Sequence, residues 1–296
     1  MGENTIMAVR DNIGIRMKGY EQIAKYGLIR RMPVAIRIDG KAFHTFTKGM
    51  KKPFDDVLIK SMQDTMQYLC KNIQGCVFGY TQSDEITLIL VDYKELNTSA
   101  WFDNEIQKIC SVSASMATMA FNRAFAKNVD EWGRSVFPSW DDGGTNEKID
   151  KSLVKLNEVY QKAIEKGALF DSRCFNIPKE EVTNLVYWRQ LDATRNSIQM
   201  VAQANFSHKE LQGLSCNMLQ NKLLTEKDIN WNNLPTTYKR GSCCVKNTYP
   251  LTWQESVKND VHIRDWNQPE RAWIIDNEIP IFKDDGRQYI DILVGL

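Results

Sequence analysis

Short apolar runs separated by polar turns predict a sheet in the first third of this chain. The first run, residues 34–38, is interrupted only by Arg37, and two further runs, residues 76–78 and 86–91, flank a short polar stretch. Runs of this length bounded by turn-forming residues are typical of buried strands, and the second and third are close enough to form a hairpin. A fourth strand is expected at residues 170–177.

Between these runs, apolar positions three or four residues apart predict helices. The first helix is expected over residues 11–26, with apolar side chains that contact the core. The second begins with Asp55 or Asp56 as its N-cap and ends near Gly75. The expected core positions are Ile15, Tyr20 and Ile23 in the first helix, and Leu58, Met62, Met66 and Leu69 in the second.

Two more long helices follow. The first runs from Asp103, its expected N-cap, to about residue 127, and the second begins after Pro178 and runs to about Phe206. The second carries Trp188 and Arg189, which we interpret as core packing and a buried ion pair. The apolar face of the first is expected to comprise Ile106, Ile109, Val112, Met116 and Met119. Short helices are expected at residues 209–211 and 216–223, a turn at 231–235 and a strand at 238–246.

The order strand, helix, strand, strand, helix, strand predicts an α+β fold with a ferredoxin-like antiparallel sheet, the layer found in polymerase-type palms and nucleotide cyclases. Two helices then cover one face of the sheet, and the other face is open to a substrate. A change in composition predicts an insertion at about residues 128–168. We therefore expect a palm-like catalytic domain over residues 1–180 and a helical C-terminal extension, packed on the palm, over residues 181–296.

Composition narrows the class of protein. Because 43% of the 296 residues are hydrophobic, the chain is expected to fold rather than remain disordered. Seven cysteines without paired C-x-x-C spacing make a poor disulfide framework and a poor zinc site, so we expect reduced thiols. We find neither an apolar run long enough to cross a membrane nor a secretory signal, and we expect a cytoplasmic location.

Charge is unevenly distributed along the chain. The net charge is only +1, but residues 14–52 hold ten basic and two acidic residues. This positive block surrounds Asp39 and suits a polyanionic substrate. The alternative interpretation is a solvated helix face followed by a loop.

Carboxylates stand at the ends of two predicted strands. Asp39 follows the first run, and Asp84 and Glu85 follow Ser83 in the predicted hairpin turn. A strand end and a hairpin tip can meet at one edge of a sheet. Two aspartates brought together there can hold two Mg²⁺ ions for phosphoryl or nucleotidyl transfer. Each aspartate taken alone could equally belong to a strand end or a turn.

Five motifs in order along residues 14–246 resemble the tRNA(His) guanylyltransferase family. They are Arg37-Ile-Asp-Gly-Lys-x-Phe-His44, Gly79-Tyr-x-Gln-Ser-Asp-Glu85, Phe170-Asp-x-Arg173, Tyr187-Trp-Arg-Gln-x-Asp192 and Tyr238-Lys-Arg-Gly241. Each motif is weak alone, whereas five in order are specific. Because Thr194–Met200 lacks the histidine-containing element of the eukaryotic enzyme, the chain is more similar to the guanylyltransferase-like repair branch.

The resemblance implies a polymerase-type palm that adds nucleotides to the 5′ end of tRNA in the 3′-to-5′ direction, in a homotetramer built from dimers. It implies two Mg²⁺ ions, with ATP and GTP or another nucleoside triphosphate as substrates. The implied catalytic residues are Asp39, Asp84 and Glu85, and the implied metal ligands are Asp39, the carbonyl of Gly40, and Asp84. The implied nucleotide-binding residues are Asp39, Gly40, Lys41, Ala42, Phe43, His44, Lys52, Ser83, Asp84 and Lys108. The implied contacts to triphosphate or tRNA are Arg37, Arg173, Asn196, Lys239 and Arg240.

Two other functions use parts of the same pattern. A nucleotide cyclase or forward polymerase would share the metal site, but would lack the motifs that contain Arg173 and Asp192. A non-catalytic tRNA-binding protein is disfavoured because clustered carboxylates repel RNA phosphates unless a metal is bound.

Overall fold

A single antiparallel sheet of six strands organises the molecule. The computed structural model describes residues 3–137, 150–246 and 272–296. The strands are β1 (Val34–Gly40), β2 (Cys76–Gln82), β3 (Glu85–Leu90), β4 (Phe170–Asn176), β5 (Ser242–Lys246) and β6 (Trp273–Asp276). Their order, β4-β1-β3-β2-β5-β6, begins with the ferredoxin-like order, so the predicted fold class is confirmed. The division at residue 180 stays a prediction, and β5 and β6 extend the same sheet beyond it.

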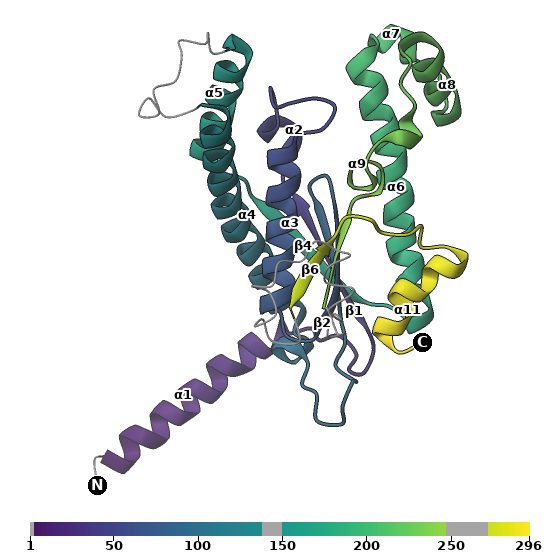
Figure 1. Ribbon diagram of the computed structural model, residues 1–296. Coiled ribbons are helices and arrows are strands. Elements are labelled where there is room, and N and C mark those ends of the chain that lie inside the picture. Colours follow the sequence, from purple (N-terminus) through teal and green to yellow (C-terminus); the bar gives the residue numbers. More distant parts are fainter. Residues whose placement is uncertain (1–2, 138–149, 247–271) are drawn as a thin grey trace.

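Two helices, α3 (Asp56–Asn72) and α4 (Ile106–Val136), cover the first face of the sheet (Figure 1). Asp55 is the N-cap of α3, as expected, and its side chain accepts a hydrogen bond from the Leu58 amide. The N-cap predicted for α4 is wrong, because Asp103 has a left-handed backbone inside the short 3-10 turn Trp101–Asn104. The helix also continues nine residues beyond its predicted end, to Val136.

The buried face of α4 differs from the predicted one. Its fully buried apolar side chains include Ile109, Ala117, Phe121 and Phe125. Of the predicted stripe, Ile109 is fully buried as expected, whereas Val112 and Met116 pack against the core from partly exposed positions.

Two further helices, one of about four turns and one of a single turn, complete this side. Helix α5 (Lys151–Lys166) lies in the predicted insertion and buries Tyr160 and Ala163. Helix α2 (Phe43–Phe46) follows β1 directly and buries both of its phenylalanines. These rings pack with Phe121, Phe125 and Phe170 in one aromatic cluster. The strand end is therefore held firmly against α4.

The second face is not open over its whole length, contrary to the sequence-based expectation. The first half of α6 (Lys179–Asn205) and α11 (Gln288–Val294) pack on it through a second apolar core. Val182, Val186 and Ile290 contribute to this core together with the sheet residues Ala35 and Ile89. The apolar packing ends before the β1 residues Arg37 and Asp39, which share this face with Ala35 because strand side chains alternate.

The far half of α6 stands beyond the sheet with three short helices (Figure 1). These are α7 (His208–Leu211), α8 (Cys216–Lys227) and α9 (Thr236–Arg240), of which α7 and α8 pack with α6 in a third core around Trp231. The predicted strand at residues 238–246 is half right, because α9 occupies its first residues and β5 the rest. Further 3-10 turns lie at Trp231–Asn233 and Asp284–Arg287.

Helix α1 (Glu3–Ile23) projects away from the rest of the chain (Figure 1). The helix was predicted, but its expected core contacts are wrong: Ile15, Tyr20 and Ile23 are 69%, 66% and 75% exposed. All seven cysteines are free thiols, and four of them are buried, as the cysteine spacing predicted. No helix in the described ranges combines the length and apolar character that a bilayer crossing requires.

Candidate active site

The two predicted metal-binding aspartates lie together at one end of the sheet. Asp39 of β1 is directly opposite Glu85 of β3, and Asp84 is the residue before Glu85 in a two-residue turn. The backbone amide of Gly40 donates to the carbonyl oxygen of Asp84 at 3.1 Å. This hydrogen bond joins the end of β1 to the hairpin tip, so carboxylates 45 positions apart in the sequence share one edge.

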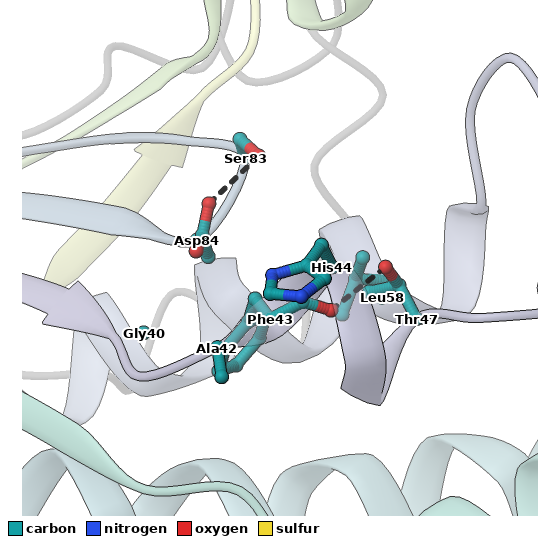
Figure 2. A pocket seen from close by; sticks show the side chains of 8 residues that line it. All are labelled: Gly40, Ala42, Phe43, His44, Thr47, Leu58, Ser83 and Asp84. Carbon is teal, nitrogen blue, oxygen red and sulfur yellow. Dashed lines mark hydrogen bonds between the residues drawn. The ribbon is translucent and has the colours of Figure 1, made fainter.

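A cavity of about 400 Å³ opens beside this edge. Figure 2 shows Ser83 and Asp84 of the hairpin facing the segment that carries Ala42 and His44. Ser83 donates to Asp84 Oδ1 at 3.0 Å, which orients the carboxylate. The lining residues are Gly40, Ala42, Phe43, His44, Thr47, Leu58, Ser83 and Asp84.

The backbone around the cavity is unusual in two places. Ala42 and Ser83, on opposite sides of it, both have a φ of 54°, in the left-handed region that residues with a Cβ rarely adopt. Such conformations cost free energy and persist only where the surroundings impose them. Strain on both walls of one cavity supports a functional role for it.

Negative charge accumulates at this site. Burial raises the pKa of the Asp39 carboxyl above its ordinary value of 3.8, and the charge of Asp171 raises it further. Burial also raises the pKa of Asp84; the hydrogen bond from Ser83 opposes this shift, whereas the charges of Asp39 and Glu85 add to it. Half-buried carboxylates whose ionised forms are disfavoured in this way gain most from a bound cation.

The donor set fits Mg²⁺. Magnesium prefers hard oxygen ligands, is usually held by one or two carboxylates, and keeps several waters or substrate phosphate oxygens. Asp39 and Asp84 supply two carboxylates, and the main chain of Gly40 lies between them. Within the described ranges, no three His, Cys, Asp or Glu side chains form a closed metal site.

Glu85 is held differently from the aspartates. Its Oε1 accepts from Arg37 Nη2 at 3.0 Å, and its Oε2 lies 3.0 Å from Arg189 Nη2. Arg189 is 9% exposed and also donates to Asp192 Oδ2 at 2.7 Å. The expected buried ion pair of Arg189 is thus confirmed. The core packing expected for Trp188 is wrong, since this indole is 52% exposed beside Arg37 and Arg189.

The predicted lysines occupy different places. Lys52 lines a second cavity that shares Thr47, Leu58 and Ser83 with the first, so it lies near the aspartates. Lys41 follows Gly40 and is exposed.

Lys108 is not brought to the cavity. It forms an ion pair with Glu105, the N-cap residue of α4. The backbone of Glu105 forms an isolated antiparallel β-bridge with Gly27, which precedes β1. That end of the sheet is opposite the end that carries Gly40.

The residues expected to contact triphosphate or tRNA fall into two groups. Arg173 lies directly opposite Arg37 across the β1–β4 pair and is 58% exposed. Asn196 lies on α6, one turn after Asp192, whose carboxylate accepts from it at 3.4 Å.

The second group lies on α9. The amine of Lys239 donates to the Asn232 carbonyl at 2.6 Å. The carbonyl of Arg240 accepts from the Tyr80 hydroxyl at 2.7 Å. Gly241 follows with a φ of +83°, and a Cβ there would lie 2.3 Å from the Thr81 carbonyl. This close contact explains the glycine of the fifth motif and ties α9 to the sheet.

Three residues near the site were not predicted. Thr47 and Leu58 line the cavity without belonging to a motif. Asp171 is opposite Asp39 across the β1–β4 pair. The register of two strands far apart in the sequence places Asp171 there, and only its position within the third motif could have indicated it.

Comparisons with known proteins identify the family of the chain. A family model described as tRNAHis guanylyltransferase matches residues 14–178, more than half of the chain. Among curated proteins, the tRNA(His) guanylyltransferase of Saccharomyces cerevisiae is 26% identical over 247 residues, which cover 75% of this chain and 90% of the relative.

Two solved structures are more similar. Both are described as a bacterial tRNA(His) guanylyltransferase (Thg1)-like protein, one in complex with ATP and one with GTP. The ATP complex is 41% identical with a TM-score of 0.72, and the GTP complex is 36% identical with a TM-score of 0.66. Each match covers 96% of this chain and 100% of the other.

Proposed function

The chain belongs to the tRNAHis guanylyltransferase family of enzymes, and from this membership we propose that it adds nucleotides to the 5′ end of tRNA in the 3′-to-5′ direction. The nucleotide is chosen by Watson–Crick pairing with the opposite strand, so the protein need not read the base itself. The reaction is repair of a shortened 5′ end, with addition of the extra guanosine to tRNA(His) as the narrower possibility.

The observation that carries this proposal is the meeting of Asp39 and Asp84 beside a cavity lined by the first two motifs. The ATP and GTP complexes of similar proteins support a nucleoside triphosphate as the ligand. The main chain of residues 40–44 and the Ser83 hydroxyl hold the triphosphate, and Lys41 and Lys52 offset its charge.

Asp39, Asp84 and the carbonyl of Gly40 are the proposed ligands of two Mg²⁺ ions. When bound, such ions lower the pKa of an attacking hydroxyl and neutralise charge on the triphosphate and the leaving group. The half-buried carboxylates with raised pKa values and the Gly40–Asp84 hydrogen bond support this assignment.

The proposed reaction has two steps. A 5′-monophosphate oxygen of the RNA attacks the α-phosphorus of ATP, which forms an adenylylated end and releases pyrophosphate. The 3′-hydroxyl of the incoming nucleotide then attacks the activated 5′-phosphorus and releases AMP. A 5′-triphosphorylated RNA needs only the second step, with pyrophosphate as the leaving group. Arg37, Arg173, Asn196, Lys239 and Arg240 are the proposed contacts to the triphosphate and the RNA.

We also propose a cytoplasmic homotetramer built from dimers. Lys108 lies at the end of the sheet opposite the cavity, so it would reach a nucleotide only in another subunit. The exposed apolar side chains of α1 offer a surface for subunit contacts. Light scattering coupled to gel filtration tests the tetramer, and a monomer at micromolar concentration would contradict it.

One experiment tests the function directly. The purified protein is incubated with 5′-truncated tRNA, Mg²⁺ and single labelled nucleotides, and the RNA end that grows is mapped. We expect growth at the 5′ end, and none in Asp39→Ala or Asp84→Ala proteins that melt normally. Label in a cyclic nucleotide or at the 3′ end would favour the cyclase or forward polymerase. Tight Mg²⁺-independent tRNA binding without transfer would favour a binding protein.

A further inference from the structure

Both oxygens of the Glu85 carboxylate are paired with arginine side chains. Its Oε1 accepts a hydrogen bond from Arg37, and its Oε2 lies 3.0 Å from a nitrogen of Arg189 in an ion pair. Charge-assisted contacts between arginine and a carboxylate are among the strongest polar contacts in proteins. Breaking either contact would leave a largely buried guanidinium without this partner, because the side chains of Arg37 and Arg189 are only 18% and 9% exposed.

We infer that Glu85 is a positioning residue, and that the bridge Arg37–Glu85–Arg189 sets the location of Asp84 relative to Asp39. Within this bridge, Arg189 is the residue through which α6 acts on the hairpin. The inference rests on the proposed function, because it concerns residues beside the proposed metal ligands and separates their roles.

Two backbone contacts also hold the hairpin tip within the sheet, and the Tyr80–Arg240 hydrogen bond holds its β2 strand to α9. The Asp84 carbonyl accepts from Gly40, and the Thr81 hydroxyl donates to the Glu85 carbonyl at 2.9 Å. Both bonds involve the backbone of neighbouring strands. The Arg189 ion pair ties the Glu85 side of this corner to α6. Because Asp84 ends the two-residue turn and Glu85 follows it directly as the first residue of β3, a displacement of Glu85 displaces Asp84 with it.

The side chain of Arg189 is almost fully buried, although not all of its guanidinium nitrogens have a hydrogen-bond partner among the described residues. It donates to Asp192 and forms an ion pair with Glu85, and its Nε is buried without a hydrogen-bond partner among the described residues. A buried guanidinium is stable only while its carboxylate partners remain in place. Removal of Arg189 would leave the charge of Glu85 beside two other carboxylates and would free its side chain to move.

The test compares Glu85→Gln, Arg189→Met and the double variant in the full-length protein. Mn²⁺ affinity is measured by electron paramagnetic resonance, and 5′ addition is measured as a function of Mg²⁺ concentration. We expect each single change to weaken Mn²⁺ binding roughly 10-fold without changing its stoichiometry, and excess Mg²⁺ to restore most of kcat. The double variant should bind Mn²⁺ no more weakly than the single variant with the lower affinity, since both changes break the same bridge.

Arg195→Met is the matched control. Arg195 pairs with Asp192, as Arg189 does, but it is 60% exposed and does not contact Glu85. Its removal should leave the Mn²⁺ affinity within about twofold of the unchanged protein. Arg189→Lys keeps the charge but not the fork-shaped geometry, and should fall between Arg189→Met and the unchanged protein. It also serves the test if Arg189→Met does not fold.

Two results would overturn the inference. The first is loss of a bound Mn²⁺ in Glu85→Gln while Arg189→Met and Arg189→Lys bind normally, which would make Glu85 a ligand. The second is additive losses in the double variant. If the unchanged protein binds Mn²⁺ but adds no nucleotide, the proposed function fails, and the Mn²⁺ affinities of the variants still decide the role of Glu85.

Discussion

A Cβ atom on Gly40 would lie 2.2 Å from Cδ2 of the Phe43 ring. The ring has no room to retreat, because its centroid lies between 5.1 and 5.4 Å from those of Phe46, Phe121 and Phe170. Gly40 is therefore required by the packing that turns the chain from β1 into α2, in addition to its proposed role as a carbonyl ligand.

Gly40→Ala is expected to destabilise the protein by about 1–3 kcal/mol, the usual cost of overpacking a close-packed core. The cavity walls should shift with Phe43, so nucleotide affinity should fall as well. Urea unfolding and nucleotide titration measure the two effects. Gly133→Ala in α4 is the matched control, since a Cβ there meets nothing within 4 Å. It should stabilise the helix by roughly 0.5–1 kcal/mol, and equal losses in both variants would contradict this account.

The sequence predicted the central strands and the meeting of the two aspartates because both depend on local pattern. The run that ends at Asp39 and the hairpin turn at Asp84 each define a strand end, and antiparallel pairing brings such ends to one edge. Site residues that come from strands distant in the sequence could not be predicted in this way. Asp171 reaches Asp39 through the register of β4, and no spacing along the chain specifies that register.

The wrong core assignments have two physical reasons. Periodicity identifies an apolar face of a helix but not what covers it. The apolar residues of α1, such as Ile15 and Ile23, therefore remain exposed in the described chain. Trp188 was assigned to the core by residue type. In the structure it stands beside Arg37 and Arg189, whose guanidinium groups lie within 5.4 and 4.4 Å of its ring centroid.

Asp84→Asn is expected to raise the melting temperature in the absence of divalent metal, by about 2 °C. Burial and the charges of Asp39 and Glu85 raise the pKa of Asp84 above 3.8, so its ionised form destabilises the fold at neutral pH. The stability advantage of the variant should shrink as the pH falls through the raised pKa, because Asp84 then becomes neutral in the unchanged protein as well. The advantage should vanish below about pH 3.8.

Mg²⁺ should stabilise the unchanged protein and not the variant. Scanning calorimetry with EDTA or Mg²⁺ measures both, and an equal response to Mg²⁺ would refute the assignment of Asp84 as a ligand.

Two tryptophans in the α6 region should differ sharply when truncated. Trp231 is 7% exposed, lies in the third core and donates to the Ser197 hydroxyl at 3.0 Å. Trp231→Ala should cost about 3–5 kcal/mol, as the loss of a large buried aromatic side chain usually does. Trp188→Ala removes a half-exposed ring and should cost about 1 kcal/mol or less. Guanidinium unfolding of both variants measures the difference, and similar costs would mean that Trp188 belongs to the core after all.

Tyr160 links the insertion to the palm and thereby to the loop beside the cavity. Its hydroxyl donates to Asp55 Oδ2 at 2.8 Å, and both side chains are buried. Asp55 also caps α3 and accepts from the amide of Lys51, next to Lys52. One carboxylate therefore joins α5, the start of α3 and the loop that carries Lys52.

Tyr160→Phe removes only the hydroxyl and should destabilise the protein by about 1.5–3 kcal/mol, since the bond ends on a charged acceptor. With Asp55 less firmly held, the loop around Lys52 should become more mobile, and KM for the nucleotide should rise more than kcat falls. Tyr68→Phe in α3 is the control, because the Tyr68 hydroxyl makes no hydrogen bond within the described ranges. Urea unfolding and steady-state kinetics compare the two variants. Matching stabilities would show that the Tyr160–Asp55 bond does not hold the insertion on the palm, whereas a stability loss with unchanged KM would separate this bond from nucleotide binding.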